Sequence, residues 1–167
     1  EALKQLEHAE NEKVDLVKLM ITGGVLDAKE KGVPGELKMK PEMVKAVCDR
    51  AHAAGYKVAA HVESPEGVKV ALANGVDSIE HGAKPYDEMI RLFKEKNAFL
   101  CTTISPAVPY ALFDRSLTNA TEVEQYNGNI VFDGIVECAR AALANDIPVV
   151  LGNDVGCPWI TQYDFWR

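Results

Sequence analysis

The fold is decided by residues 56–82, YKVAAHVESPEGVKVALANGVDSIEHG. Two short apolar runs in this stretch each end in a histidine, the first in His61 and the second in His81. Between them, Ser64 is a suitable N-cap for a helix, and Gly75 is a suitable residue to end it. This order of strand, helix and strand predicts two parallel strands joined by a helical crossover.

The same alternation continues in both directions along the chain. Strands are expected at 15–21, 56–61, 77–81, 98–104 and 148–154, and helices at 41–54, 65–73, 86–96 and 130–145. Residues 1–12 are also helix-like, and the proline-containing residues 105–129 predict a long functional loop. Five such repeats predict an α/β fold with a parallel sheet, either a doubly wound open sheet or part of a (β/α)8 barrel. A whole barrel needs about 250 residues, so this chain has the length of only part of one.

The composition is that of an ordinary globular domain and excludes several function classes. The chain has 167 residues, a net charge of −7 and 47% hydrophobic residues. The acidic balance argues against nucleic acid as a partner, and no apolar run has the length of a membrane span. Four cysteines lie far apart without a CxxC pair, which favours a reducing, cytoplasmic location over a disulfide scaffold or zinc ribbon. No glycine-rich motif for a dinucleotide or a nucleoside triphosphate follows any expected strand.

Four polar residues interrupt or end separate expected strands. They are Lys18, His61, His81 and Asp154. In parallel α/β folds the ligand lies beyond the carboxyl ends of the strands, so these side chains are expected at one rim. Zn²⁺ takes imidazole nitrogen and carboxylate oxygen as ligands. A lysine amine is a poor ligand, but a buried, neutral lysine is able to react with CO₂ and give a carboxylate-like carbamate.

Each of these four residues also has a purely structural interpretation. Lys18 could be a lysine at a sheet edge, either histidine could be hydrogen-bonded in the core, and Asp154 could cap a helix. Their positions on separate strands, three of them at strand ends, favour a common site.

Neighbouring residues are assigned by the alternation of side chains along a strand. Glu63 lies on the same face as His61 and is predicted either to contact substrate or to support the residues that do, whereas Glu80 is predicted to face outward with a structural role. Tyr110 and Phe113 follow a strand end and are predicted to line a substrate pocket, although aromatic residues in such places are as often packing residues.

Four motifs in order resemble the amidohydrolase superfamily, in particular its imidazolonepropionase-like and Xaa-Pro or Xaa-Arg dipeptidase-like branch. They are DLVKLMITGG at 15–24, KVAAH at 57–61, GVDSIEHG at 75–82 and LGND at 151–154. The resemblance implies an incomplete TIM-type barrel, about strands four to eight, with one or two divalent metals, Zn²⁺ or another. It implies that Lys18 is a carbamylated lysine bridging the metals and that His61, His81 and Asp154 are metal ligands. Asp154 would also move the proton of the attacking water.

The sequence also departs from the pattern of this family. It contains no His-x-His pair, which in the family lies on the first barrel strand, and it lacks the earlier strands and the small β-sandwich domain. Residues 1–167 are therefore predicted to be part of one hydrolase barrel domain.

The implied function is metal-dependent hydrolysis of an amide, peptide or cyclic amide bond in a small molecule or dipeptide. The expected partner is a second copy or the remainder of the barrel. Two alternatives stay open: a Schiff-base lyase that uses Lys18, and an inactive fragment or scaffold that requires a second polypeptide.

Overall fold

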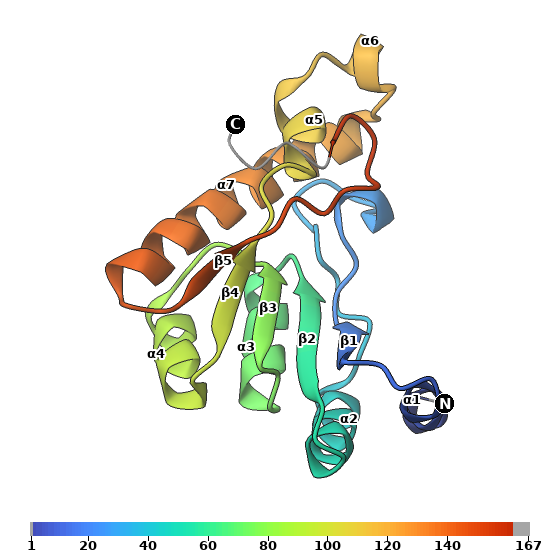
Figure 1. Cartoon of the computed structure of the whole chain (residues 1–167). Helices are drawn as coiled ribbons and strands as arrows, with labels where there is room; N and C mark the ends of the chain where they lie inside the picture. Colours follow the sequence, from blue (N-terminus) through green and yellow to red (C-terminus); the bar gives the residue numbers. More distant parts are fainter. Residues whose placement is uncertain (1, 162–167) are drawn as a thin grey trace.

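The computed structural model describes residues 2–161, which form alternating strands and helices (Figure 1). The elements, in chain order, are α1 (Ala2–Asn11), β1 (Leu16–Met20), η1 (Val25–Asp27), α2 (Pro41–Ala53), β2 (Lys57–Val62), α3 (Pro65–Ala73), β3 (Ser78–His81), α4 (Asp87–Lys96), β4 (Phe99–Thr102), α5 (Ala107–Leu112), α6 (Arg115–Thr118), α7 (Glu122–Ala144) and β5 (Val149–Leu151). All five predicted strands are present, each within a few residues of its predicted bounds.

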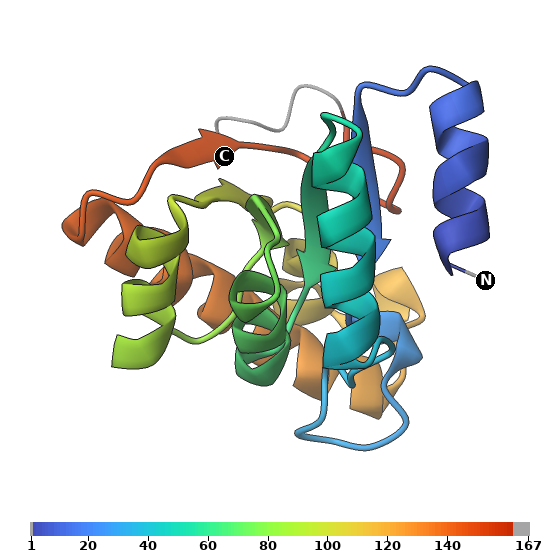
Figure 2. The ribbon, with the colours of Figure 1, turned by 90° about the horizontal axis from the view of Figure 1, so that it is seen from below.

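The order of the strands decides between the two predicted architectures. The sheet is entirely parallel, and its spatial order is β1-β2-β3-β4-β5, the same as the chain order. A doubly wound sheet reverses direction at a switch point and carries helices on both faces. Here α2, α3 and α4 lie side by side on one face (Figure 2). This one-directional winding is that of a TIM-type barrel, of which the chain forms part.

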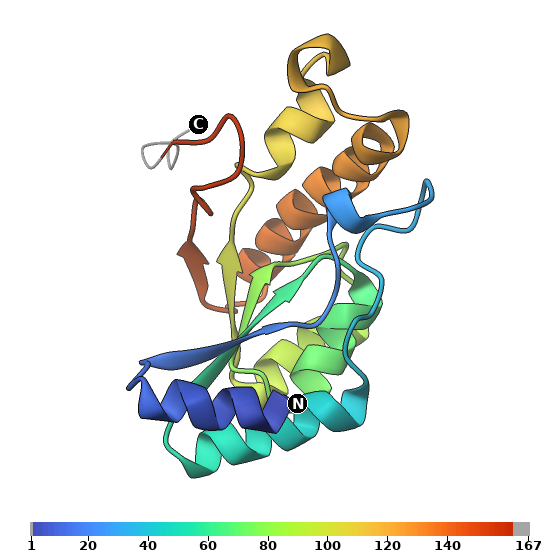
Figure 3. The same cartoon turned by 90° about the vertical axis from the view of Figure 1, so that its right-hand side faces the viewer.

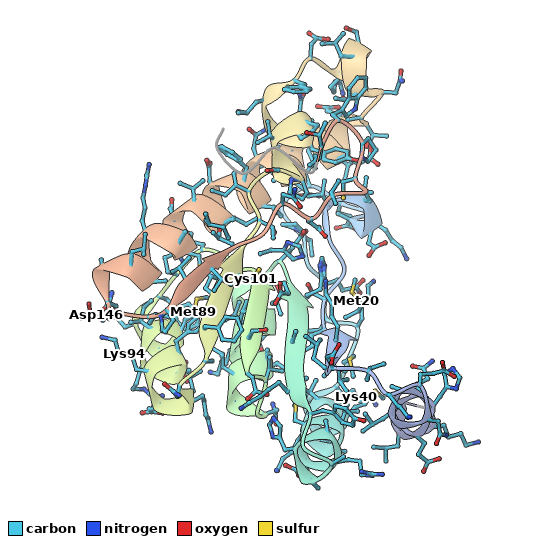
Figure 4. The ribbon with its side chains drawn as sticks, in the orientation of Figure 1. Met20, Lys40, Met89, Lys94, Cys101 and Asp146 are labelled. Atoms are coloured by element: carbon cyan, nitrogen blue, oxygen red, sulfur yellow. The ribbon has the colours of Figure 1, made fainter. Side chains whose placement is uncertain are left out.

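The two faces of the sheet differ in burial. Val58, Ile79 and Leu100 point toward the helices and are completely buried. On the opposite face, Met20 is 54% exposed and Val150 is 44% exposed, and no helix of residues 2–161 covers them. Met20 and Cys101, labelled in Figure 4, lie on this uncovered face, Met20 on the edge strand β1 and Cys101 on β4, next to the other edge. In a closed barrel this face is the interior.

The strand, helix and strand at 56–82 form as the sequence predicts. The Ser64 hydroxyl accepts a hydrogen bond from the backbone N–H of Gly67 at 3.2 Å, which caps the first turn of α3. Gly75, just after α3, has a φ of +103°, a conformation that side chains disfavour. Strands β2 and β3 pair in parallel, with Ala59 opposite Ser78.

The predicted loop at 105–129 is wrong, because most of it is helical. It contains α5 and α6, and α7 begins at Glu122 rather than at residue 130. The start of α7 is a capping box, in which the Thr121 hydroxyl accepts from the Glu124 backbone and the Glu124 carboxylate accepts from the Thr121 backbone. The Thr-x-x-Glu spacing of a capping box is present in the sequence, but the residues around it are mostly polar and lack the apolar periodicity that predicts a helix.

Helices α5 and α7 and the short η1 stand above the carboxyl ends of the strands (Figure 1). They pack around a second apolar cluster, separate from the main core, that includes Val25, Ala107 and Ile135. Figure 3 shows η1 beside α7. These segments form the walls of the candidate site. Among residues 2–161, no helix is both long and apolar enough to cross a membrane.

Candidate metal centre

His61 and His81 bring their imidazole rings together at the carboxyl ends of β2 and β3. Nδ1 of His61 lies 2.7 Å from Nε2 of His81, and the rings meet edge to face with centroids 4.6 Å apart. The register places the Cα of His81 opposite Val62 rather than opposite His61. His81 departs from strand geometry, with a φ of +71°, and this left-handed conformation accompanies the turn of its ring toward His61.

Both imidazoles are held in the neutral form. Burial lowers the pKa of His81 to about 3, and the positive charges of His61 and Lys18 act in the same direction. Burial also lowers the pKa of His61, more than the backbone of Gly23 and the nearby carboxylate of Asp154 raise it. Neutral imidazole is the form that binds a metal ion, because its free nitrogen lone pair is the ligand.

Glu63 completes a group of three potential ligands. One ligand atom each from His61, Glu63 and His81 lies within 4.8 Å of the others. Burial raises the pKa of Glu63 to about 7, a hydrogen bond from the backbone N–H of Val25 opposes the shift, and the charges of Asp154 and Asp27 add to it. A carboxyl group in this setting gains from a nearby cation, since a cation offsets both burial and the neighbouring negative charges.

A cavity of about 250 Å³ lies over these three residues. Its lining includes the two histidines, Glu63, Tyr110 and Asp154. Asp154 follows β5 with a φ of +50° and is exposed at the cavity. The rest of the lining is mostly apolar and comes from η1, α5 and α7. Residues from four separate segments of the sequence, around positions 61–63, 81, 110 and 154, therefore meet at one site.

Two of the predicted site residues lie elsewhere. Lys18 is exposed on the uncovered face of β1 and is not among the cavity-lining residues, although its charge lowers the pKa of His61 and of His81. The prediction placed Lys18 in a strand buried on both faces, but the described residues cover only one face. Phe113 lies at the end of α5 and lines a different cavity, of about 640 Å³, with Phe132.

The structure corrects the predicted orientation of Glu80. Glu80 is the register partner of both His61 and Cys101, so it lies on the uncovered face rather than outward among the helices. Its carboxylate accepts a hydrogen bond from the Ser78 hydroxyl at 3.0 Å. The prediction assumed that side chains alternate between the two faces of the strand, so that Glu80 faces away from His81. It failed because the left-handed backbone of His81 turns its side chain out of this alternation.

One contact of the site was missed in the sequence. The Thr103 hydroxyl is hydrogen-bonded to Nδ1 of His81 and fixes the orientation of that ring. A metal-binding histidine commonly uses its second nitrogen in this way. The signal is the pair Thr102–Thr103 at the end of an apolar run, a polar strand end like those at His61, His81 and Asp154.

The residues present fit a divalent metal. Nδ1 of His61 and Nε2 of His81 face each other, the second nitrogen of His81 is already bonded, and a carboxylate lies within ligand range. The remaining nitrogen, Nε2 of His61, is buried and has no hydrogen-bond partner among residues 2–161. Zn²⁺ accepts two neutral imidazoles together with one carboxylate, and both Asp154 and Glu63 line the cavity beside the imidazoles, so the donor set does not depend on Glu63.

Comparison with known proteins gives relatives that are all longer than this chain. A crystal structure from Bifidobacterium longum, described as a candidate prolidase, is 35% identical with a TM-score of 0.89, over 99% of this chain and 41% of its own. A Xaa-Pro dipeptidase solved with methionine in its active site is 25% identical with a TM-score of 0.76, over 93% of this chain and 38% of its own. A structure described as an amidohydrolase shares the fold, at 22% identity and a TM-score of 0.77, over 92% and 37% of the two chains.

Among curated sequences, uncharacterised proteins of Mycobacterium bovis and Mycobacterium tuberculosis are 38% identical over 63 residues. That match spans 38% of this chain and 17% of theirs. No model of a protein family matches the chain. The chain thus spans about two fifths or less of the length of the relatives described here. The 35% identity relates the chain to part of the candidate prolidase, and the chain shares its barrel fold with the structure described as an amidohydrolase.

Proposed function

We propose that this chain carries part of the active site of a metal-dependent hydrolase that cleaves C–N bonds in amides, peptides or cyclic amides. The observation that supports it most is the pair of neutral imidazoles, His81 buried and His61 half-buried, whose nitrogens lie 2.7 Å apart beside a carboxylate. Zn²⁺ is the metal that this donor set suits best. The relatives described as prolidase, dipeptidase and amidohydrolase support the same class of reaction.

A divalent metal bound here would supply Lewis acidity and a water of lowered pKa. His61 and His81 hold it, and Thr103 keeps the ring of His81 in place. Asp154, exposed at the cavity, accepts the proton of the attacking water and delivers it to the leaving nitrogen. Its position beyond β5 puts it on the same side of the sheet as both imidazoles.

We assign Lys18 the role of a bridging ligand in its carbamylated form. As an ammonium group it opposes a cation at the site, as its effect on the two histidines shows. Conversion to a carbamate reverses the charge and supplies two oxygen atoms. Both this role and that of a Schiff-base lyase require the rest of the barrel to bury Lys18, which is exposed in residues 2–161. The lyase is not favoured, because the relatives are described as prolidase, dipeptidase and amidohydrolase.

Residues 1–167 are proposed to be one part of a barrel domain. The uncovered face carries exposed apolar residues such as Met20 and Val150, and within residues 2–161 both edge strands, β1 and β5, have one unpaired side. The remainder of a barrel, or a second copy of the chain, would cover them. The four free thiols suit the reducing, cytoplasmic environment that we propose.

The substrate is proposed to be a small molecule or dipeptide with an apolar group. Val25, Ala107 and Ile135 give the cavity apolar walls, and Tyr110 adds an aromatic ring. The dipeptidase with bound methionine shows that a related site takes a single amino acid. Phe113 is not proposed to contact the substrate in the same cavity, since it lines the other one.

The test uses the complete protein that contains this chain. Metal content is measured first, followed by turnover of a panel of Xaa-Pro and other dipeptides, lactams, and esters matched to the amides. We expect hydrolysis of at least one amide, loss of activity on chelation and recovery on adding Zn²⁺ or another divalent metal. In Asp154→Asn, kcat should fall by about 10²- to 10⁴-fold, the usual contribution of a general acid–base group.

Exchanging an exposed aspartate far from the cavity, Asp49→Asn, serves as the control and should leave kcat unchanged. Full activity in protein from which metal has been removed would contradict the proposal. Hydrolysis of the esters without any of the matched amides would contradict the assignment to C–N bonds.

A further inference from the structure

The carboxylate of Glu63 is bonded to the backbone of the segment that follows β1. Oε2 of Glu63 accepts a hydrogen bond from the N–H of Val25 at 3.1 Å. The backbone N–H of Glu63 in turn donates to the hydroxyl of Thr22 at 3.0 Å, and Thr22 is fully buried. Glu63 therefore holds the start of this segment through both its side chain and its backbone.

Two glycines allow this close approach. A Cβ on Gly24 would lie 2.7 Å from Oε2 of Glu63, although the Gly24 backbone, with φ −133° and ψ −161°, suits any residue. A Cβ on Gly35 would lie 2.7 Å from the carbonyl carbon of Glu63, and Gly35 has a φ of +74°. At Gly35 the neighbour is backbone and φ is positive, so only glycine fits there, whereas a methyl group at Gly24 would push the flexible Glu63 carboxylate aside.

The segment held in this way forms a wall of the cavity. Val25, Leu26 and Asp27, which make up η1, all line it. Further along, the buried amide of Asn127 on α7 accepts from the Gly32 N–H and donates to the carbonyl of Glu30, both at 2.8 Å. The segment is thus hydrogen-bonded to the residue after β2 at one end and to α7 at the other. The hydrogen bonds of Glu63 are the ones nearer to the imidazoles.

We infer that Glu63 is a positioning residue: its carboxylate fixes the backbone at Val25 and thereby sets the wall of the cavity that receives the substrate side chain. The inference rests on the proposed function, since it takes this cavity as the substrate site. It differs from a role as a metal ligand, which the position of Glu63 near the two histidines also allows.

Two substitutions separate these roles, because they retain opposite properties of the side chain. Glu63→Gln keeps the length and a carbonyl oxygen to accept the Val25 N–H, but loses the negative charge. Glu63→Asp keeps the charge but is one methylene shorter, so it does not reach Val25. If Glu63 positions the wall, Glu63→Gln should behave like the native protein and Glu63→Asp should not. If Glu63 acts as a metal ligand or through its charge, Glu63→Asp should be the variant closer to the native protein.

Hydrogen exchange of the Val25 amide in the metal-free complete protein is the first measurement. We expect Glu63→Asp to lower its protection by about tenfold or more, and Glu63→Gln to retain protection within about threefold. Glu66→Gln, on the exposed first turn of α3, is the matched control and should match the native protein. This measurement needs neither metal nor substrate, so it is independent of the proposed function.

Kinetics on the fastest dipeptide of the panel is the second measurement. In Glu63→Asp, KM should rise about tenfold with kcat nearly unchanged and with metal stoichiometry unchanged, while Glu63→Gln should keep the native KM. Gly24→Ala, whose methyl group displaces the carboxylate from the other side, should raise KM in the same way. Combined with Glu63→Asp, it should add little further, because both changes break one contact.

Loss of bound metal in Glu63→Gln, or unchanged Val25 exchange in Glu63→Asp, would overturn the inference. If no dipeptide or amide is hydrolysed at all, the proposed function fails while the exchange result still decides whether Glu63 positions the wall.

Discussion

Two clusters that combine histidine with a carboxylate lie at opposite ends of the same sheet. At the amino ends of the strands, the carboxylate of Asp77 contacts His52, Lys57 and the N–H of Val58, each at 2.8 Å. At the carboxyl ends, His61 and His81 contact each other, and Nε2 of His61 is buried without a partner among residues 2–161. The residue types are similar, but their environments are not.

The difference separates a stabilising cluster from a binding site. Hydrogen bonds from its three partners lower the pKa of Asp77 despite the opposing effect of partial burial, so its charge is already balanced within the chain. The carboxyl-end cluster has the opposite properties: burial keeps its imidazoles neutral and raises the pKa of Glu63 to about 7. A ligand would gain little binding free energy at the amino-end cluster, because its charges are already paired within the chain. A cation at the carboxyl-end cluster would gain more, because the two imidazoles and Glu63 are desolvated there without an opposite charge.

The largest expected effect comes from replacing the histidines of the carboxyl-end cluster, with the histidine of the amino-end cluster replaced as the control. His61→Asn and His81→Asn in the complete protein should each abolish stoichiometric metal binding and reduce turnover by more than about 100-fold, since loss of a ligand exceeds the 10- to 100-fold cost of losing its supporting partner. His52→Asn is the matched change at the other end and should keep both metal and activity. Metal analysis after equilibrium dialysis measures the difference. Equal metal loss in His52→Asn and His81→Asn would remove the distinction between the clusters.

A second large effect is expected at Lys18, the predicted bridge between metals. Lys18→Ala should lose one metal equivalent and about 100-fold in turnover, and acetate or propionate in solution should restore part of both. Lys18→Arg should not be restored, because guanidinium stays charged and does not form a carbamate. Two bound metals with near-native turnover in Lys18→Arg would show that the lysine is structural.

The fold was largely predictable because its signals are local. The strand and helix at 56–73, with the Ser64 cap and the Gly75 stop, appear where the sequence places them. The sequence left the barrel and the doubly wound sheet open, because strand order is a property of the whole sheet. The error at 105–129 has a local cause: α7 begins with polar residues whose only helical signal is the capping box at Thr121.

The sequence indicates which strand ends carry the site residues, but it does not indicate how their side chains are oriented or which residues they contact. His61 and His81 were chosen for their places after apolar runs, and the structure brings their rings together. The positive φ of His81 reverses the side-chain alternation on which the predicted orientation of Glu80 depended. The tie between Glu63 and Val25 joins residues 38 positions apart, and no spacing rule along one strand indicates it.

A smaller effect is expected at adjacent threonines, and it tests whether the environment of His81 is built for binding. Thr103 is bonded to Nδ1 of His81, whereas the neighbouring Thr102 hydroxyl is buried and has no partner among residues 2–161. Thr103→Val should lower metal affinity by about 10- to 100-fold. Thr102→Val, an equal change one residue away, should leave metal affinity unchanged. Equal metal dissociation constants for the two variants would show that the hydroxyl of Thr103 does not support His81.

The smallest expected effect lies at the amino-end cluster and concerns stability rather than metal. The pKa of Asp77 is lower in the folded chain than the usual aspartate value of 3.8, because its partial burial, which raises the pKa, is outweighed by hydrogen bonds from Lys57, His52 and the Val58 N–H. The unfolded carboxyl therefore binds its proton first as pH falls, so the cluster contributes fully above about pH 4 and loses its contribution below that pH. Asp77→Asn should cost about 1 kcal/mol near pH 7, a modest figure because Lys57 and His52 are substantially exposed. Urea unfolding of both proteins from pH 3 to pH 7 measures the cost, which should shrink toward zero at the acid end. A cost that stays constant over that range would show that Asp77 acts through its shape rather than its charge, and the contrast between the two clusters would then rest on the carboxyl-end site alone.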